Sequence, residues 1–183
     1  MLSLPRAEAE SGPPGRFSAA SAGLLRLHRH SLMHVMVLGG TAEEREQVAF
    51  EFHRESPLRL GPFVVVDCVR EESRLLGALE CWMAQVSRAQ SGNPLRAAAR
   101  GTLYLDSIDE MSHRIQRALL TFADRFGCVD EGPDDAEWAG RLIVGSAADP
   151  AHAVAEGRFL AALYDHLDKI RVEMGPARHR GAA

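Results

Sequence analysis

The sequence predicts an α/β fold of three layers, in which helices cover both faces of a parallel five-stranded sheet. Short apolar runs alternate along the chain with longer segments whose apolar residues recur at helical spacing. This alternation is typical of a parallel sheet, because the chain must cross back over the sheet between neighbouring strands. The length of 183 residues, with 46% hydrophobic and 25% charged residues, suits one globular domain with its own core.

The five expected strands are short apolar runs, which is typical of strands that are buried on both faces of a parallel sheet. They are residues 34–38, 63–68, 102–106, 142–145 and 170–174. In the last run apolar and polar residues alternate, which predicts a position near an edge of the sheet. Helices are expected between the strands, at residues 18–30, 42–54, 71–89, 112–126, 150–156 and 159–167.

The two ends of the chain differ in composition from the region between them. Prolines and glycines lie among small and acidic residues at the N-terminus, so residues 1–17 are expected to form a disordered leader. Residues 18–175 are expected to form the folded core and residues 176–183 a tail. An acidic run at residues 130–135 predicts a turn.

The turn after the first expected strand is similar to a phosphate-binding loop that has lost its phosphate-binding residues. The P-loop pattern is G-x-x-x-x-G-K-S/T, and its backbone N–H groups bind phosphate at a helix N-terminus. Gly39 matches the first glycine, but the other three positions are occupied by Glu44, Arg45 and Glu46. Glu43 and Glu44 bring carboxylates to the place of the phosphates, and like charges about 4 Å apart repel by about 1 kcal/mol in water.

Four further segments carry a resemblance to a known family. They read PFVVVDC at 62–68, GTLYLDSIDEM at 101–111, RLIVGSAAD at 141–149 and AEGRF at 155–159. With the loop, they resemble the central AAA+ ATPase domain of bacterial sigma-54-dependent transcription activators, the NtrC-like family. The corresponding family phrases are PFVxVNC, GGTLFLDEIGE, RxIAATN and EGRFRxDLYYRL. The resemblance covers residues 18–180 and implies a P-loop NTPase fold with strand order 5-1-4-3-2.

Several positions on which the family's ATPase activity depends are changed in this chain. The resemblance places the vestigial nucleotide-binding residues at Gly39, Gly40, Thr41, Arg45 and Glu46. The vestigial Walker B pair is Asp106 and Ser107, and Ser107 stands in place of the glutamate that prepares the attacking water. A serine hydroxyl does not accept a proton from water as a carboxylate does.

The positions that complete the family's active site are also changed. The sensor asparagine corresponds to Ala147, and the two arginine fingers, which act across a subunit interface, correspond to Leu160 and His166. Leucine brings no charge to the transferring phosphoryl group, and histidine brings only a titratable one. The sigma-factor loop GAFTGA is absent, and the chain stops after the counterpart of PPLRER. We therefore expect neither a lid subdomain nor a DNA-binding domain.

These departures predict a non-catalytic pseudo-ATPase with no catalytic residue, no metal site and no cofactor. We expect a regulatory or adaptor protein that acts through protein–protein contacts in transcription regulation or signalling. An intact sigma-54 activator or a signalling protein is the expected partner, and the chain is expected to be a monomer or a weak oligomer that does not contact DNA directly. The alternative is a residual nucleotide-binding protein or weak ATPase that uses Arg45 and Asp106 with ATP and Mg²⁺.

Individual residues have plainer structural interpretations. We expect Arg45 to form salt bridges at the surface and Asp106 to be a polar residue retained at a strand end. Without a lid, apolar side chains are expected to be exposed, at Phe159, Leu163 and Ile170.

Overall composition excludes several classes of protein. A net charge of −4 gives no support for general nucleic-acid binding. Cys68, Cys81 and Cys128 contain no C-x-x-C pair and are interpreted as reduced thiols. The sequence has neither a signal peptide nor an apolar stretch of membrane-spanning length, so a cytoplasmic location is expected.

Overall fold

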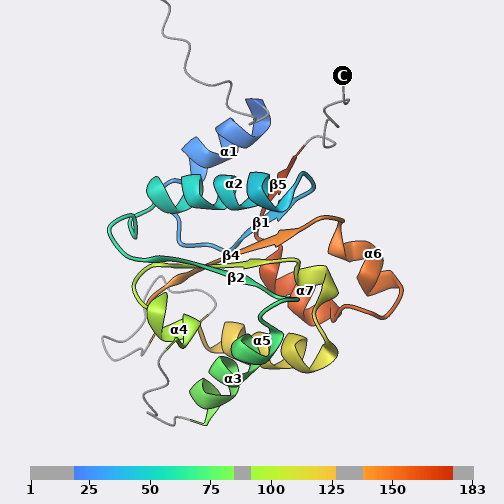
Figure 1. Cartoon of the computed structure of the whole chain (residues 1–183). Helices are drawn as coiled ribbons and strands as arrows, with labels where there is room; N and C mark the ends of the chain where they lie inside the picture. The colour runs from blue at the N-terminus through green and yellow to red at the C-terminus, as the bar shows by residue number, and fades with distance from the viewer. Residues whose placement is uncertain (1–18, 85–91, 127–137, 175–183) are drawn as a thin grey trace, which may run out of the picture.

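The computed structural model describes residues 19–84, 92–126 and 138–174, which form one sheet with helices on both sides (Figure 1). The strands are β1 (Val35–Leu38), β2 (Phe63–Asp67), β3 (Thr102–Asp106), β4 (Arg141–Ser146) and β5 (Ile170–Glu173). All are parallel, and their order is β2-β3-β4-β1-β5. Read from the other edge, this is the order 5-1-4-3-2, so the predicted topology and the edge position of the last strand are confirmed.

The expected helices begin and end within two residues of their predicted bounds, except that α3 was predicted to extend to Ala89 and ends at Met83. They are α1 (Ala19–His28), α2 (Ala42–Arg54), α3 (Glu72–Met83), α5 (His113–Phe126), α6 (Pro150–Ala155) and α7 (Ala161–Leu167). Two single-turn elements were not predicted, α4 (Pro94–Ala97) and the 3-10 helix η1 (Ile108–Glu110). The expected leader, acidic turn and tail, residues 85–89 of the expected third helix, and Cys128 all lie outside the described residues.

Two apolar clusters fill the space between the three layers. On one face of the sheet, α2 and α1 cover side chains of alternate strand positions, including Val35, Tyr104 and Ile143. On the other face, α3, α5 and α7 cover the intervening positions, such as Leu103 and Val144. Each strand therefore sends successive side chains into different clusters, as the period of two requires. This explains why the strand sequences are apolar almost throughout.

Helix α5 shows how the sequence directs one helix face into the core. Ile115, Leu119 and Phe122 recur at a spacing of three and four residues, and each is at most 1% exposed. Full burial of such a side chain contributes about 1.5–3 kcal/mol. The polar residues on the opposite side of the helix remain at the surface.

One expectation about the surface is wrong. Phe159, Leu163 and Ile170 were expected to be exposed, yet each is at most 3% exposed. Phe159 and Leu163 pack in the cluster beneath α5, and Ile170 packs in the cluster beneath α2. The layers of this domain thus cover these side chains themselves. Among the described residues, no helix combines the length and the apolarity needed to cross a lipid bilayer.

Candidate functional site

The loop between β1 and α2 keeps the backbone shape of a tight strand-to-helix turn. Gly39 and Gly40 have φ angles of +81° and +62°, a region that glycine enters without steric cost. The Gly39 N–H donates to the carbonyl of Ser146 at 2.9 Å, which ties the loop to β4. Thr41 then caps α2, because its hydroxyl accepts a hydrogen bond from the Glu44 N–H at 3.2 Å.

The carboxylate of Glu44 accepts a hydrogen bond from one of the backbone N–H groups of the loop. Its Oε2 accepts a hydrogen bond from the Thr41 N–H at 3.0 Å, which completes a capping box. N–H groups at a helix N-terminus are the donors that a phosphate-binding loop offers to its ligand. Here a side chain of the same helix satisfies one of them. Glu43 and Glu46 lie on the exposed side of α2.

Arg45 is buried, so its predicted position at the surface is wrong. Its side chain is 4% exposed, and it donates from Nε and Nη2 to the two carboxylate oxygens of Asp106, each at 2.8 Å. Its Nη1 donates to the carbonyls of Gly39 and Gly40, at 3.3 and 3.1 Å. The sequence correctly indicated a salt bridge. It did not indicate the partner, because Asp106 is 61 residues away in the sequence.

Tyr104 and Gly145 complete this network, and sequence reasoning missed both. Because Tyr104 and Asp106 are two residues apart on β3, they face the same side of the sheet, and the Tyr104 hydroxyl donates to Asp106 Oδ1 at 2.7 Å. A Cβ atom at Gly145 would lie 2.2 Å from the Tyr104 hydroxyl oxygen and 2.4 Å from Asp106 Oδ1. The glycine of β4 therefore makes room for the hydroxyl and the carboxylate. Strand alternation could have indicated Tyr104.

The electrostatics of the network favour a permanent ion pair. Burial alone would raise the pKa of Asp106, but hydrogen bonds from Arg45 and Tyr104 outweigh burial and lower it. Burial opposes the charge of Arg45, yet the bonds to Asp106 raise the pKa of its guanidinium. Burial and the hydrogen bond to Asp106 both raise the pKa of Tyr104. Asp106 therefore stays ionised and Tyr104 stays protonated across the neutral range.

The other active-site positions of the family are placed nearby but lack its chemistry. Ser107 follows Asp106 in a left-handed conformation with φ of +58°, and its Oγ lies 3.4 Å from Asp106 Oδ2. Ala147 is exposed directly after β4, at the same edge of the sheet. Neither side chain supplies a carboxylate or an amide.

The two positions that match arginine fingers serve the packing of α7. The Leu160 N–H donates to Oε1 of the buried Gln116 at 2.8 Å, and Gln116 Nε2 donates to the carbonyl of Arg158 at 2.9 Å. The His166 ring lies against the ring of His34, with centroids 5.3 Å apart. Its Nδ1 lies 3.4 Å from the Asp124 carboxylate. Gln116, which holds this segment, was not predicted.

In this arrangement the residues do not fit a magnesium nucleotide. Mg²⁺ requires carboxylate and phosphate oxygens that are free to coordinate it, and both oxygens of Asp106 accept hydrogen bonds from Arg45. Elsewhere among residues 19–84, 92–126 and 138–174, no group of three or more His, Cys, Asp or Glu side chains is arranged to hold a metal ion.

The sequence also matches a described family across nearly all of these elements. Residues 19–173 match the sigma-54 interaction domain. The chain belongs to the sigma-54 interaction domain family. That assignment confirms the resemblance carried by the loop, the β3 segment and the AEGRF segment.

Two curated relatives give the scale of the similarity. The C4-dicarboxylate transport transcriptional regulatory protein DctD of Pseudomonas aeruginosa is 33% identical over 183 residues, which cover 91% of this chain and 38% of DctD. The anaerobic nitric oxide reductase transcription regulator NorR of Escherichia coli is 30% identical over 156 residues, which cover 81% of this chain and 31% of NorR. The chain thus spans less than two fifths of either relative.

Solved structures confirm the P-loop NTPase fold. NtrX from Brucella abortus in complex with ATP superposes with a TM-score of 0.69 at 22% identity, over 92% of this chain and 39% of NtrX. The P-loop NTPase domain of a sigma-54 transport activator from E. coli superposes with a TM-score of 0.58 at 16% identity, over 86% of this chain and 93% of that domain.

Proposed function

We propose that this chain is a non-catalytic member of the sigma-54 interaction domain family, a pseudo-ATPase that regulates other proteins by contact. The observation that carries this proposal is the buried, two-pronged ion pair between Arg45 and Asp106. It joins the residue at the P-loop lysine position to the residue at the Walker B position. The protein's own guanidinium thereby neutralises the carboxylate that would otherwise help to hold Mg²⁺.

The energetics of nucleotide binding support the same conclusion. A nucleotide could use Asp106 only after Arg45 had left it, and separating a buried ion pair typically costs about 3–5 kcal/mol. The incoming phosphates would then meet the carboxylates of Glu43 and Glu44 in the first turn of α2. Arg45 would also have to withdraw from the carbonyls of Gly39 and Gly40. These costs oppose binding before any chemical step begins.

The process that such a protein serves is proposed from its relatives. DctD and NorR are both named as transcription regulators, so we place this chain in cytoplasmic regulation of transcription, with an intact sigma-54 activator as its partner. It would act by contact with that protein rather than by contact with DNA. Coexpression of the tagged chain with such an activator, followed by co-purification, tests the partner, and absence of any complex would refute this choice.

A weak ATPase that uses Arg45 and Asp106 is the competing function. It requires the Arg45 fork to bind phosphate instead of Asp106, and it predicts that ATP binds saturably and that Arg45→Ala abolishes this binding.

Titration calorimetry with ATP and Mg²⁺, together with measurement of phosphate release, tests the two functions directly. The pseudo-ATPase predicts no binding heat at about 1 mM ATP, where a ligand of millimolar affinity, worth about 4 kcal/mol, is already half bound, and no phosphate release above a blank. Saturable binding that depends on Arg45 would overturn the proposal. NtrX from Brucella abortus, whose structure holds ATP, is the comparison measured in the same way.

A further inference from the structure

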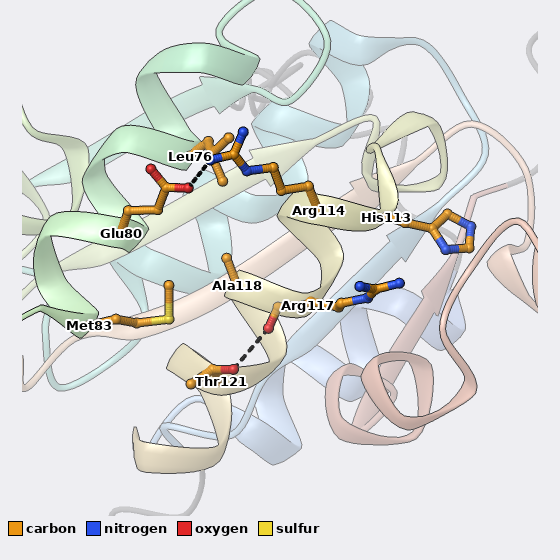
Figure 2. Close-up of a pocket in the computed structure, with 8 residues that line it drawn as sticks. All are labelled: Leu76, Glu80, Met83, His113, Arg114, Arg117, Ala118 and Thr121. Carbon is orange, nitrogen blue, oxygen red and sulfur yellow. Dashed lines mark hydrogen bonds and ion pairs between the residues drawn. The ribbon is translucent and has the colours of Figure 1, made fainter.

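A groove of about 500 Å³ runs between α3 and α5, on the face of the sheet opposite α2. Figure 2 shows the side chains that line it, which come from these two helices. Leu76 and Met83 of α3 and Ala118 of α5 form its apolar part. Leu76 and Met83 are half-buried, so part of their apolar surface meets solvent.

The polar part of the groove carries more positive than negative charge. Arg114 forms an ion pair with Glu80 at 2.5 Å, so these two charges offset each other across the groove. Arg117 and His113 are exposed on α5 and point away from that pair (Figure 2). Within the described part of the chain, neither side chain has an ion-pair or hydrogen-bond partner. A ligand for this groove should therefore present apolar surface beside negative charge.

The outer face of α2 presents that combination. Glu43, Glu46 and Phe50 are exposed and lie at positions i, i+3 and i+7, which share one helix face. Phe50 is 44% exposed, although it is aromatic. Glu43 and Glu46 have no ion-pair or hydrogen-bond partner among the described residues. Helices that dock in grooves commonly use anchors at this spacing.

We propose that the outer face of α2 of one copy docks in the α3–α5 groove of a second copy. Phe50 covers the apolar part of the groove, and the two glutamates pair with Arg117 and His113. A single copy cannot make this contact with itself, because α2 and the α3–α5 pair lie on opposite faces of the same sheet (Figure 1).

The symmetry of the contact determines the kind of assembly that the copies form. Two different surfaces meet, so the interface is heterologous, and a pair of copies retains one free surface of each kind. Association therefore proceeds head to tail, into a ring where the rotation between copies closes and into an open chain of copies where it does not. The charged rim makes this association weaken as salt is added. The contact uses Glu43 and Glu46 of α2 but neither the Arg45–Asp106 ion pair nor the segment of Leu160 and His166, so the proposal goes beyond the pseudo-ATPase function.

Sedimentation velocity of the full chain over a range of concentrations, without nucleotide, tests the proposal. We expect the wild-type sedimentation coefficient to rise with concentration. Arg117→Glu alone and Glu46→Arg alone should each weaken association about tenfold, because one attraction becomes a repulsion. The double variant carries both reversals in every copy, so the pair is restored with exchanged signs and association should recover.

Two control reversals change charge elsewhere on the surface. Arg70→Glu and Glu156→Arg alter residues whose side chains are 86% and 59% exposed and which line neither surface, and both should associate as the wild type does. Wild-type protein that stays monomeric up to about 1 mM, the weakest affinity of interest, would overturn the proposal. So would equal losses in the control variants, or a double variant that associates no better than the singles.

Discussion

Two buried arginines lie at opposite ends of α2, and the protein stabilises them in different ways. Arg45 is in the first turn of α2 and bonds both oxygens of Asp106. Arg141, the first residue of β4, is fully buried without a carboxylate partner among the described residues. Its Nε donates to the carbonyl of Met33 at 3.0 Å and its Nη1 to the carbonyl of Phe52 at 3.2 Å.

The helix dipole explains the difference. The N-terminal end of a helix carries partial positive charge, so a cation buried there needs an anion beside it. The C-terminal end carries partial negative charge, and the Phe52 carbonyl that Arg141 bonds lies in the last turn of α2. The Arg141 guanidinium also lies over the Phe52 ring, 5.6 Å from its centroid. Burial lowers the pKa of Arg141 to about 10, so it is still charged at neutral pH.

Removing the cation from the N-terminal end should have the largest effect. Arg45→Met leaves Asp106 buried and charged, which is expected to lower the free energy of unfolding by about 3–5 kcal/mol. Urea denaturation measures it. The double variant Arg45→Met/Asp106→Leu removes both charges and should lose only about 1–3 kcal/mol, because the Tyr104 hydroxyl then lacks its acceptor. A double variant as unstable as Arg45→Met would show that the unpaired charge of Asp106 is not the cause of the lost stability.

Replacing Arg141, at the C-terminal end of α2, should lower the free energy of unfolding by less than replacing Arg45. Arg141→Met removes two hydrogen bonds but leaves no buried charge behind, so we expect a loss of about 1–3 kcal/mol. Urea denaturation under identical conditions compares the two variants. A larger loss of unfolding free energy for Arg141→Met than for Arg45→Met would contradict the explanation by the helix dipole.

A histidine near Arg141 should make the fold sensitive to acid. Burial, the nearby His166 and Arg141 lower the pKa of His34 from 6.5 to about 4. Since the unfolded chain binds this proton first, stability is full above about pH 6.5 and falls as the pH drops toward 4. Between about pH 7 and about pH 5, we expect His34 to account for a loss of about 2 kcal/mol.

Unfolding in urea at each pH, for the wild type and for His34→Phe, measures this contribution. The variant should show a flatter pH dependence over the same range. Asp106 does not confuse the result, because its pKa lies below the ordinary value for an aspartate and it stays ionised throughout. Identical profiles for the two proteins would refute the assignment to His34.

The smallest expected effect concerns the cap of α2. Thr41→Ala removes the hydroxyl that accepts the Glu44 N–H, and loss of such a cap costs about 1 kcal/mol. Thr121→Ala, in the exposed middle of α5, is the matched control and should change stability by less than about 0.5 kcal/mol. Thermal unfolding of both variants distinguishes a specific cap from a general effect of losing a threonine.

Sequence periodicity predicted the layers and all five strands, since each strand is a run of apolar residues between helical segments. The strand order was inferred from the resemblance to the family, because the hydrophobic pattern along the chain does not show which strands are neighbours in the sheet. Short elements such as α4 escaped prediction, because a single turn has no periodicity. The environment of Arg45 was also missed. Two of its four acceptors are the carboxylate oxygens of Asp106, which only the fold brings next to it, and a charged residue is assigned to the surface by default.

The exposure of Phe159, Leu163 and Ile170 was predicted wrongly for a related reason. It was inferred from the expectation that no lid subdomain covers this surface, whereas α5, α7 and α2 of this domain cover those side chains. Whether a side chain is buried depends on which helices pack against it, and this follows from the order of the strands rather than from the local sequence.

The most direct test of the central claim compares the wild-type loop with a restored one. The variant Glu44→Gly/Arg45→Lys/Glu46→Thr recreates the full P-loop pattern after Gly39. Thermal unfolding with and without ATP and Mg²⁺ measures binding, because ligand at 100 times its dissociation constant stabilises a protein by about 2.7 kcal/mol. We predict no stabilisation of the wild type and a clear gain for the variant. Stabilisation of the wild type equal to or greater than that of the variant would contradict the account.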